Sequence, residues 1–291
     1  MKQAMAFART ALRVDTIAAY KAQHSYDPVY TSLRDRLRES HGTSMQDLRV
    51  LDWGCGYFYP NLIFLGQDVK EMVGIDVYPV YRDGWQTLVR WSGGLRKPKA
   101  TALALLEYVH AARYYRQLQR SYGIRAEHER YQIVKYDGQR MPLPDESFDA
   151  AVSNAVLQEV SGPLQDCARE LARVLKPGAT LDLEWHNFYA WSGHVLGEEY
   201  GRRQPWGHLQ GGPYRPCLNR LKPEEALEAF SPWFTDLQLL AHDRHHRVRG
   251  KDPAFEPEGE EFLTPELQAR LSEYPRDLLL TRGFVLQGRR K

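Results

Sequence analysis

Residues 50–56 read Val50-Leu51-Asp52-Trp53-Gly54-Cys55-Gly56, and a second apolar run, Met72–Ile75, ends in Asp76. The apolar start of the first stretch indicates the end of a buried strand. Its two glycines permit a tight turn, in which a missing Cβ lets the backbone approach a ligand. An acid about 20 residues after such a turn can reach the ribose hydroxyls of a nucleotide. The pattern therefore predicts a nucleoside-containing cofactor across the ends of adjacent parallel strands.

The acid before the glycines separates this turn from a dinucleotide-binding fingerprint. That fingerprint is Gly-x-Gly-x-x-Gly and places a helix N-terminus on a pyrophosphate. Here Asp52 precedes the glycines, and position 59 is Tyr rather than Gly. An anionic side chain disfavours a pyrophosphate and suits a cofactor that carries an amino group and a sulfonium.

Residues 51–58 resemble the first motif of the class I S-adenosylmethionine-dependent methyltransferases, specifically the type 11-like group related to small-molecule and ubiquinone-type methyltransferases. That motif runs apolar-apolar-Asp-x-Gly-x-Gly-x-Gly, and this chain has Phe58 where the third glycine is usual. Later segments resemble the family in the expected order: the loop after the third strand (136–145), the fourth strand and its exit (147–157), and the helix and Pro-Gly turn before the fifth strand (171–179).

The resemblance implies an α/β fold: a Rossmann-like, doubly wound sheet of seven mostly parallel strands, the last one antiparallel, with helical insertions. The alternation of strand and helix signals along the chain agrees with a mostly parallel sheet covered on both faces. We expect an N-terminal helical segment over residues 1–45 and a methyltransferase domain over residues 46–291. Insertions fall at about 78–130 and 186–220, and we interpret the second as a substrate lid.

The resemblance also implies a role for each residue that follows a predicted strand. Asp52 and the backbone of Gly54, Cys55 and Gly56 would hold the amino-acid part of S-adenosylmethionine, Asp76 the ribose, Asp137 and Gly138 the adenine, and Asn154 would line the cleft beside the methionine. In open α/β sheets ligands bind outside the carboxyl ends of the strands, so these residues should share one rim. For Asp76 and Asp137 the alternative role is a carboxylate that caps a turn or helix.

A hydroxyl acceptor benefits from a general base, and histidine is the natural choice near neutral pH. His186, directly after the fifth predicted strand, is the best-placed candidate, and His194 and His208 lie in the same aromatic segment. Glu159 and Glu184 are weaker candidates. The spacings of 8 and 14 residues between these histidines match no compact ligand motif such as His-x-x-x-His, and we expect no metal site.

Two further patterns concern the insertions. The tryptophans and tyrosines of residues 185–214 predict a mostly apolar pocket with a few polar points, which suits a planar or sugar-like small molecule. Residues 101–122 have a helical pattern, with Leu103, Leu106, Val109 and then Tyr114 or Tyr115 at helical spacing. We expect this stripe to pack against the core, and a partner-binding face is the alternative.

Composition limits the class of protein. The 291 residues carry a net charge of +2, which gives no electrostatic case for nucleic acid. Three cysteines far apart imply no disulfide framework and fit a reducing cytosol. We find neither an 18-residue apolar stretch nor a signal peptide, so we expect a cytoplasmic protein without a membrane span. The sequence leaves the oligomeric state open.

The leading interpretation is an enzyme that uses S-adenosylmethionine to methylate a small-molecule acceptor, with oxygen as the expected site. N-methylation, or action on RNA or protein, stays open as a second interpretation. No Asn-Pro-Pro-Tyr-type motif follows the fourth predicted strand, which counts against amino-methylation of nucleic acids. A noncatalytic binding or scaffold protein with the same fold is the alternative from a different class.

Overall fold

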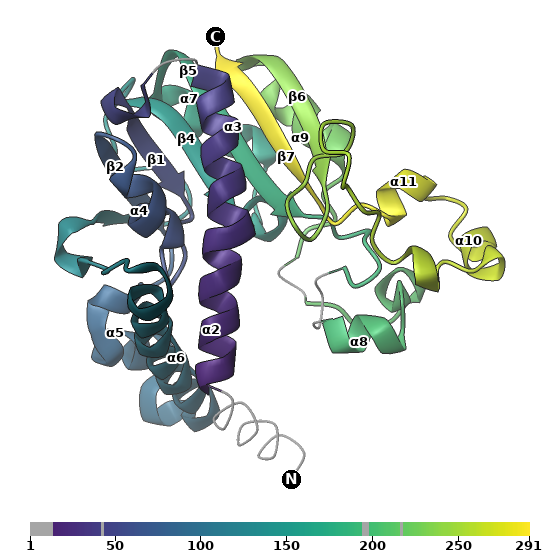
Figure 1. Cartoon of the computed structure of the whole chain (residues 1–291), viewed down its shortest axis with the longest axis horizontal. Coiled ribbons are helices and arrows are strands. Elements are labelled where there is room, and N and C mark those ends of the chain that lie inside the picture. The colour runs from purple at the N-terminus through teal and green to yellow at the C-terminus, as the bar shows by residue number, and fades with distance from the viewer. Residues whose placement is uncertain (1–13, 42–43, 194–197, 216–217) are drawn as a thin grey trace.

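A seven-stranded sheet organises the computed structural model, which describes residues 14–41, 44–193, 198–215 and 218–291 (Figure 1). The strand order is β3-β2-β1-β4-β5-β7-β6. The strands are β1 (Arg49–Trp53), β2 (Glu71–Asp76), β3 (Gln132–Lys135), β4 (Phe148–Asn154), β5 (Leu175–His186), β6 (Phe234–His242) and β7 (Gly283–Arg290). Strands β1 to β5 are parallel, and β7 pairs antiparallel with both β5 and β6. The predicted fold class is confirmed, with the last strand antiparallel.

The two apolar runs, Val50-Leu51 and Met72–Ile75, form the centre of this sheet. Leu51 of β1 pairs with Val73 of β2, and both side chains are fully buried. A parallel sheet is covered on both faces, which explains the near-continuous apolar runs. The helix after β1, α4 (Pro60–Phe64), begins with a proline, a residue suited to the first helical position because it lacks an N–H group.

Helices cover both faces of the sheet. On one face α3 (Thr31–His41) packs on β5, and α2 (Val14–His24) extends past the sheet edge beside α6 (Pro98–Tyr122) (Figure 1). The chain breaks between α2 and α3 at Asp27-Pro28, which is a cis peptide bond. On the other face lie α7 (Leu164–Val174) and α9 (Pro223–Phe230), whose apolar residues join the core below β4 and β5. The ends of β1, β2, β4 and β5 therefore open on one edge between these layers.

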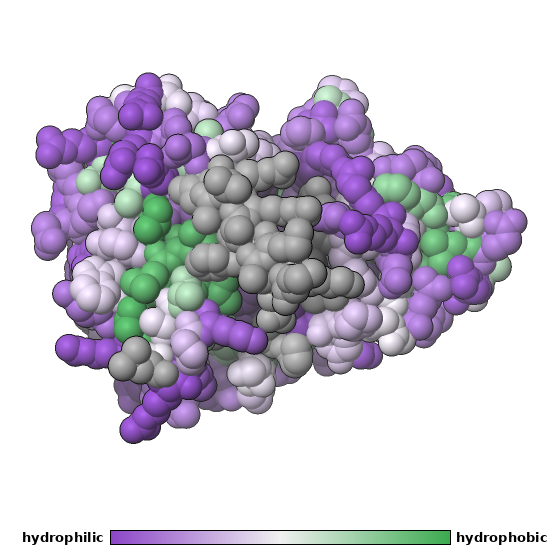
Figure 2. All heavy atoms as spheres, turned by 90° about the horizontal axis from the view of Figure 1, so that it is seen from below, coloured by the Kyte–Doolittle hydropathy of each residue, from purple (hydrophilic) through white to green (hydrophobic). Residues whose placement is uncertain are grey.

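The predicted stripe of α6 packs over only half its length. Tyr114 and Tyr115 are buried, but Leu103 and Val109 are 59% and 45% exposed. The first half of α6 lies beyond the sheet against the short helix α5 (Gly84–Trp91), so it has no core to cover. Exposed apolar side chains gather on this end of the molecule, and Figure 2 shows the apolar patch from below. The expectation for the N-terminal half of the stripe was wrong.

The C-terminal region contains two short helices. Residues 264–280 form α10 (Pro265–Arg270) and α11 (Arg276–Leu279), separated around Pro275. Proline has no N–H group for the helical ladder and disfavours a helical residue before it, so the helix ends early. Helix α8 (Glu198–Arg203) lies on the same side of the molecule (Figure 1). Within the described residues, we find no helix with the length and apolar character to cross a membrane.

Candidate functional site

The glycine turn after β1 is closed by its own backbone. The N–H groups of Gly54 and Cys55 both donate to the Ile75 carbonyl, at 2.8 and 3.1 Å, and the N–H of Gly56 donates to Asp76 Oδ2 at 2.7 Å. Both glycines have φ of +71°. A Cβ at Gly54 would lie 2.3 Å from Val156 Cγ2, so the turn and the exit of β4 are in direct contact. Glycine is required at Gly54 on both counts.

Asp52 brings a buried carboxyl group to this turn. Its side chain is fully buried; Oδ1 accepts a hydrogen bond from Asn61 Nδ2 at 3.0 Å, whereas Oδ2 has no partner among the described residues. Burial raises the pKa of Asp52 to about 7, and the nearby Asp76 acts in the same direction. A buried polar atom without a partner is costly, so Oδ2 is suited to a ligand that carries a proton or a positive charge.

Asp76 is the second carboxylate of the turn and is 6% exposed. Besides Gly56, it accepts a hydrogen bond from the N–H of Tyr78 at 2.8 Å through Oδ1. These two bonds fix the carboxylate at the end of β2 and leave further lone pairs on both oxygens. The capping role considered for this residue and the predicted ribose contact are therefore compatible.

The donors and charges of this turn decide which ligand it suits. A pyrophosphate needs free N–H groups at a helix N-terminus. Here the N–H groups of residues 54–56 are all engaged, the following helix starts with Pro60, and two carboxylates flank the turn. The arrangement disfavours a phosphate and fits a ligand with an ammonium group, a sulfonium and ribose hydroxyls.

The other predicted cofactor residues lie along the same edge. Asp137 and Gly138 are exposed in the loop after β3, where Asp137 Oδ1 accepts from the N–H of Gln139 at 2.9 Å. Asn154 ends β4 and donates to Glu184 Oε1 of β5 at 3.3 Å. Cys55 points away from the turn opening, since its Sγ packs where a side chain on Gly74 would lie. The set thus follows the ends of four neighbouring strands.

Phe58, which replaces the third glycine of the motif, turns into the helical layer. Its ring is buried, lies edge-on to Tyr114 of α6 with centroids 5.2 Å apart, and has the Lys21 ammonium 3.2 Å from its centroid. The bulk at this position is therefore accommodated between α2 and α6 as part of their packing.

The three histidines predicted as candidates for the general base are in different situations. His186 ends β5, and burial lowers its pKa to about 3, with Arg282 acting in the same direction. His208 is buried, with Nε2 2.7 Å from the Phe188 carbonyl oxygen. His194 lies outside the described residues. Burial lowers the pKa of His186 and of His208, which makes both rings poor acceptors of a hydroxyl proton.

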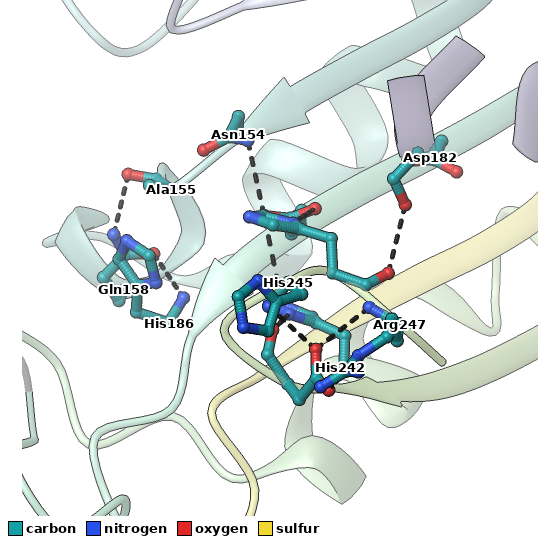
Figure 3. A network of polar contacts seen from close by, with 12 residues as sticks. Asn154, Ala155, Gln158, Asp182, His186, His242, His245 and Arg247 are labelled. Carbon is teal, nitrogen blue, oxygen red and sulfur yellow. Dashed lines mark hydrogen bonds and ion pairs between the residues drawn. The ribbon is translucent and has the colours of Figure 1, made fainter. Parts of the chain in front are cut away.

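A second polar group at the ends of β5 and β6 is not among the predicted residues. Glu184 Oε2 lies 3.1 Å from His246 Nδ1, and its Oε1 lies 3.9 Å from His242 Nε2. All three side chains are buried. Figure 3 shows this network, with Asn154 at the end of β4 and with His245 and Arg247 on the turn after β6. The signal in the sequence is the spacing His242-x-x-x-His246, which the predicted set omits.

An aromatic cavity begins just after β5, in the segment where a pocket was predicted, but its lining is about equally polar and apolar, whereas a mostly apolar one was expected. Its volume is about 420 Å³. Phe188, Tyr189, Tyr214 and Tyr274 provide the rings that line it, and Arg220 lies over the ring of Tyr214 at 5.1 Å. The volume is in the range of small-molecule sites. Glu273, Arg220 and Lys222 add charged points to the lining.

Comparisons with known proteins match part of the chain to a methyltransferase domain. Residues 51–182 match the sequence profile of a family described as methyltransferase domain, whereas no curated protein matches the chain. Similar solved structures include the YcgJ protein from Bacillus subtilis, at 18% identity and TM-score 0.46, covering 90% of this chain and 98% of that one. A geranyl diphosphate C-methyltransferase from Streptomyces coelicolor A3(2), in complex with Mg²⁺, geranyl diphosphate and S-adenosyl-L-homocysteine, is 12% identical with TM-score 0.45, covering 90% and 79%.

An S-adenosylmethionine-dependent methyltransferase from Mesorhizobium loti is 14% identical, with TM-score 0.45 and coverage of 89% of this chain and 98% of that one. These low similarities say nothing about the acceptor. The family match covers the glycine turn, the acid that ends β2 and the strands β2 to β4, and the observed sheet has the seven strands and the antiparallel last strand that the resemblance implies. Residues 51–182 therefore match a methyltransferase domain, in agreement with the resemblance of the glycine turn to class I S-adenosylmethionine-dependent methyltransferases.

Proposed function

We propose that the enzyme methylates a hydroxyl group of a small molecule. The observation that carries this proposal is the buried group Glu184, His242 and His246, which is hydrogen-bonded to Asn154 beside the proposed cofactor site. Amines and thiolates accept a methyl group with little help, whereas a hydroxyl gains from groups that assist loss of its proton. We assign that assistance to this group in place of His186, His194 or His208.

The proposed cofactor contacts follow the geometry of the turn. Asp52 would hold the ammonium group, Asp76 the ribose hydroxyls, Asp137 and Gly138 the adenine, and Asn154 the methionine side. When bound, S-adenosylmethionine supplies an electrophilic methyl group on a sulfonium. The chain's own part is to orient the acceptor, exclude water and provide a route for the acceptor's proton.

We place the acceptor at the end of β5, with residues 186–220 as its lid. Support comes from the aromatic cavity, whose first residue, Phe188, follows His186 by two positions. Aromatic walls with a few charged points suit a planar or sugar-like molecule.

Acceptor chemistry can be tested with matched compounds. The purified enzyme is incubated with methyl-labelled S-adenosylmethionine and with sets of acceptors that differ only in a hydroxyl, amino or thiol group. We expect label in hydroxyl members, and we expect their amino counterparts to remain unlabelled. Transfer to the amino members alone would assign the enzyme to N-methylation and contradict the proposal.

Replacing Gly54 by alanine should weaken cofactor binding at least tenfold. A left-handed φ costs a residue with a Cβ about 1–2 kcal/mol, and the new methyl group would overlap the Val156 side chain at 2.3 Å. Isothermal titration with S-adenosylhomocysteine measures the loss. Gly66→Ala is the matched control, since its Cβ would meet only Met72 Cβ at 3.9 Å. Equal affinity in both variants would show that Gly54 does not shape the site.

Cofactor affinity should depend on the ionisation of Asp52. Its pKa is about 7 in the folded chain, against an ordinary value of 3.8. The free protein should therefore lose stability as the pH rises from about 4 to 7, because the folded state holds a proton that the unfolded state has released. A cationic cofactor prefers the ionised carboxylate, so its affinity should rise about tenfold from pH 6 to pH 8. Titrations in buffers of different ionisation enthalpy should detect proton release on binding at pH 6.

The Asp52→Asn variant is the control for this pH dependence. The amide does not titrate, so the affinity change between pH 6 and pH 8 should be lost. A wild-type affinity that stays flat over the same range would refute the assignment of Asp52 to the ammonium group.

A further inference from the structure

Three metal-binding side chains converge where β5 and β6 end. Glu184 lies on β5, His242 is the last residue of β6, and His246 is in the turn that follows (Figure 3). Their exposed fractions are 2%, 1% and 6%. One ligand atom from each residue lies within 4.8 Å of the other two. Two imidazoles and one carboxylate form a donor set that first-row transition metals favour.

The hydrogen bond of the His242 ring fixes which of its nitrogens is available. Nδ1 lies 2.9 Å from the Asp243 carbonyl oxygen. A carbonyl only accepts, so Nδ1 must carry the proton, and in the neutral ring Nε2 presents a bare lone pair. Nε2 is buried, has no hydrogen-bond partner among the described residues, and lies 3.9 Å from Glu184 Oε1. Two acceptors therefore face each other in a buried space, an arrangement that a cation between them would stabilise.

The turn after β6 holds His246 in an unfavourable backbone conformation. His246 has φ of +57°, a left-handed conformation that is unfavourable for a residue with a Cβ. Asp243 stabilises this turn, since its Oδ1 accepts from the N–H groups of His245 and Arg247 at 2.8 and 3.1 Å. The His246 ring is thereby stacked on His242, with centroids 4.9 Å apart and planes 9° from parallel. Both rings direct a nitrogen toward the same carboxylate.

The charge balance around Glu184 leaves room for a cation. Arg36 makes a two-pronged ion pair with Asp182, at 2.9 Å for both contacts, so these two charges neutralise each other. The distance from Arg36 Nη2 to Glu184 Oε2 is longer, 3.4 Å. The negative charge of Glu184 is otherwise met by His246 and by the amide of Asn154. Either a proton on His246 or a bound metal ion would neutralise the negative charge of Glu184.

We propose that Glu184, His242 and His246 bind one divalent first-row metal ion, with Zn²⁺ as the representative. Ligand atoms about 2.1 Å from a common ion lie no more than about 4.2 Å apart, and the contacts of Glu184 with the two histidines, at 3.1 and 3.9 Å, are within that limit. The donated hydrogen bond from His242 Nδ1 to a carbonyl is a typical outer-shell support for a metal-binding histidine. Three protein ligands leave a coordination position open, which is characteristic of catalytic sites.

The role we assign to this ion rests on the proposed O-methylation. The open position would take the hydroxyl oxygen of the acceptor beside Asn154. A bound divalent ion lowers the pKa of a hydroxyl or water ligand by several units, so the proton can be released to solvent near neutral pH. No histidine then needs a high basicity.

Metal binding can be measured on the full chain without any acceptor. After treatment with a chelator, the wild-type protein is titrated with Zn²⁺ by calorimetry, and Co²⁺ is used as a spectroscopic substitute. We expect one ion per chain, and we expect His242→Ala and His246→Ala each to weaken binding about 100-fold or more. The matched control is His245→Ala, an exposed histidine of the same turn, which should bind as the wild type does. Retained binding of S-adenosylhomocysteine by the variants establishes that they are folded.

Two results would overturn the metal site: wild-type protein that takes up no Zn²⁺ or Co²⁺ with one-to-one stoichiometry, or equal affinity in the wild type and all three histidine variants. Neither result touches the acceptor assignment, since the labelled-methyl assay with matched hydroxyl and amino compounds is independent. Conversely, an enzyme that binds Zn²⁺ through these residues but methylates only amines would keep the site and lose its proposed role.

Discussion

The Asp76→Ala variant is expected to lose at least about 100-fold in affinity for S-adenosylhomocysteine. A hydrogen bond to a charged group contributes about 1.5–3 kcal/mol, and two ribose hydroxyls would lose their acceptor. The substitution also removes the partner of the Gly56 N–H group, which helps to fix the glycine turn. Isothermal titration measures the loss, and circular dichroism checks that the variant is folded.

Asp83→Ala is the control for this effect. Asp83 likewise accepts from a backbone N–H group, that of Val80 at 2.8 Å, and it lies in the segment after β2. Its carboxylate is not part of the glycine turn, so its loss should leave cofactor affinity within about twofold of the wild type. A normal affinity in Asp76→Ala would undo the ribose assignment.

Replacement of Arg36 by leucine is expected to lower the free energy of unfolding by about 3–5 kcal/mol. Arg36 is 6% exposed and is the main cation next to the fully buried Asp182. Its loss would leave two buried carboxylates, those of Asp182 and Glu184, with one fewer positive charge between them. In urea unfolding, this loss of stability should appear as a lower midpoint concentration, with the dependence of the free energy on urea unchanged.

Two further variants separate the charge effect from simple loss of packing. The double variant Arg36→Leu with Asp182→Leu removes both members of the pair and should recover a substantial part of the stability. Arg34→Leu, on the same helix, breaks an ion pair whose Asp35 partner is 64% exposed, and should change stability by less than about 1 kcal/mol. An Arg36→Leu protein as stable as Arg34→Leu would show that the buried pair does not hold α3 on the sheet.

The centre of the fold could be predicted because its signals are local. The runs that end at Asp52 and Asp76 each form a strand, and the turn glycines lie between them. Prolines mark the break at Asp27-Pro28 and the start of α9. The same kind of signal, Pro275, indicates the break between α10 and α11, although an apolar pattern runs through it.

The polar group around Glu184 could not be assembled from the sequence. Its members are 62 residues apart from Glu184 to His246 and 148 from Arg36 to Glu184. Periodicity tells which face of an element is buried, but not which polar side chains from distant elements meet there. Likewise, nothing local to Leu103 shows that the first half of α6 has no sheet beneath it. The four-residue spacing of His242 and His246 was visible, but the residue that completes the set was not.

Calorimetric titration of the wild-type chain with S-adenosylhomocysteine, with NAD⁺ as the comparison ligand, tests directly whether the glycine turn binds the methyl donor. The glycine turn has no free N–H group at residues 54–56 and is flanked by the carboxylates of Asp52 and Asp76. We therefore predict one S-adenosylhomocysteine per chain with a dissociation constant in the micromolar range, and no binding of the pyrophosphate-containing NAD⁺. Absence of S-adenosylhomocysteine binding, or comparable binding of NAD⁺, would contradict the assignment of this turn to the methyl donor.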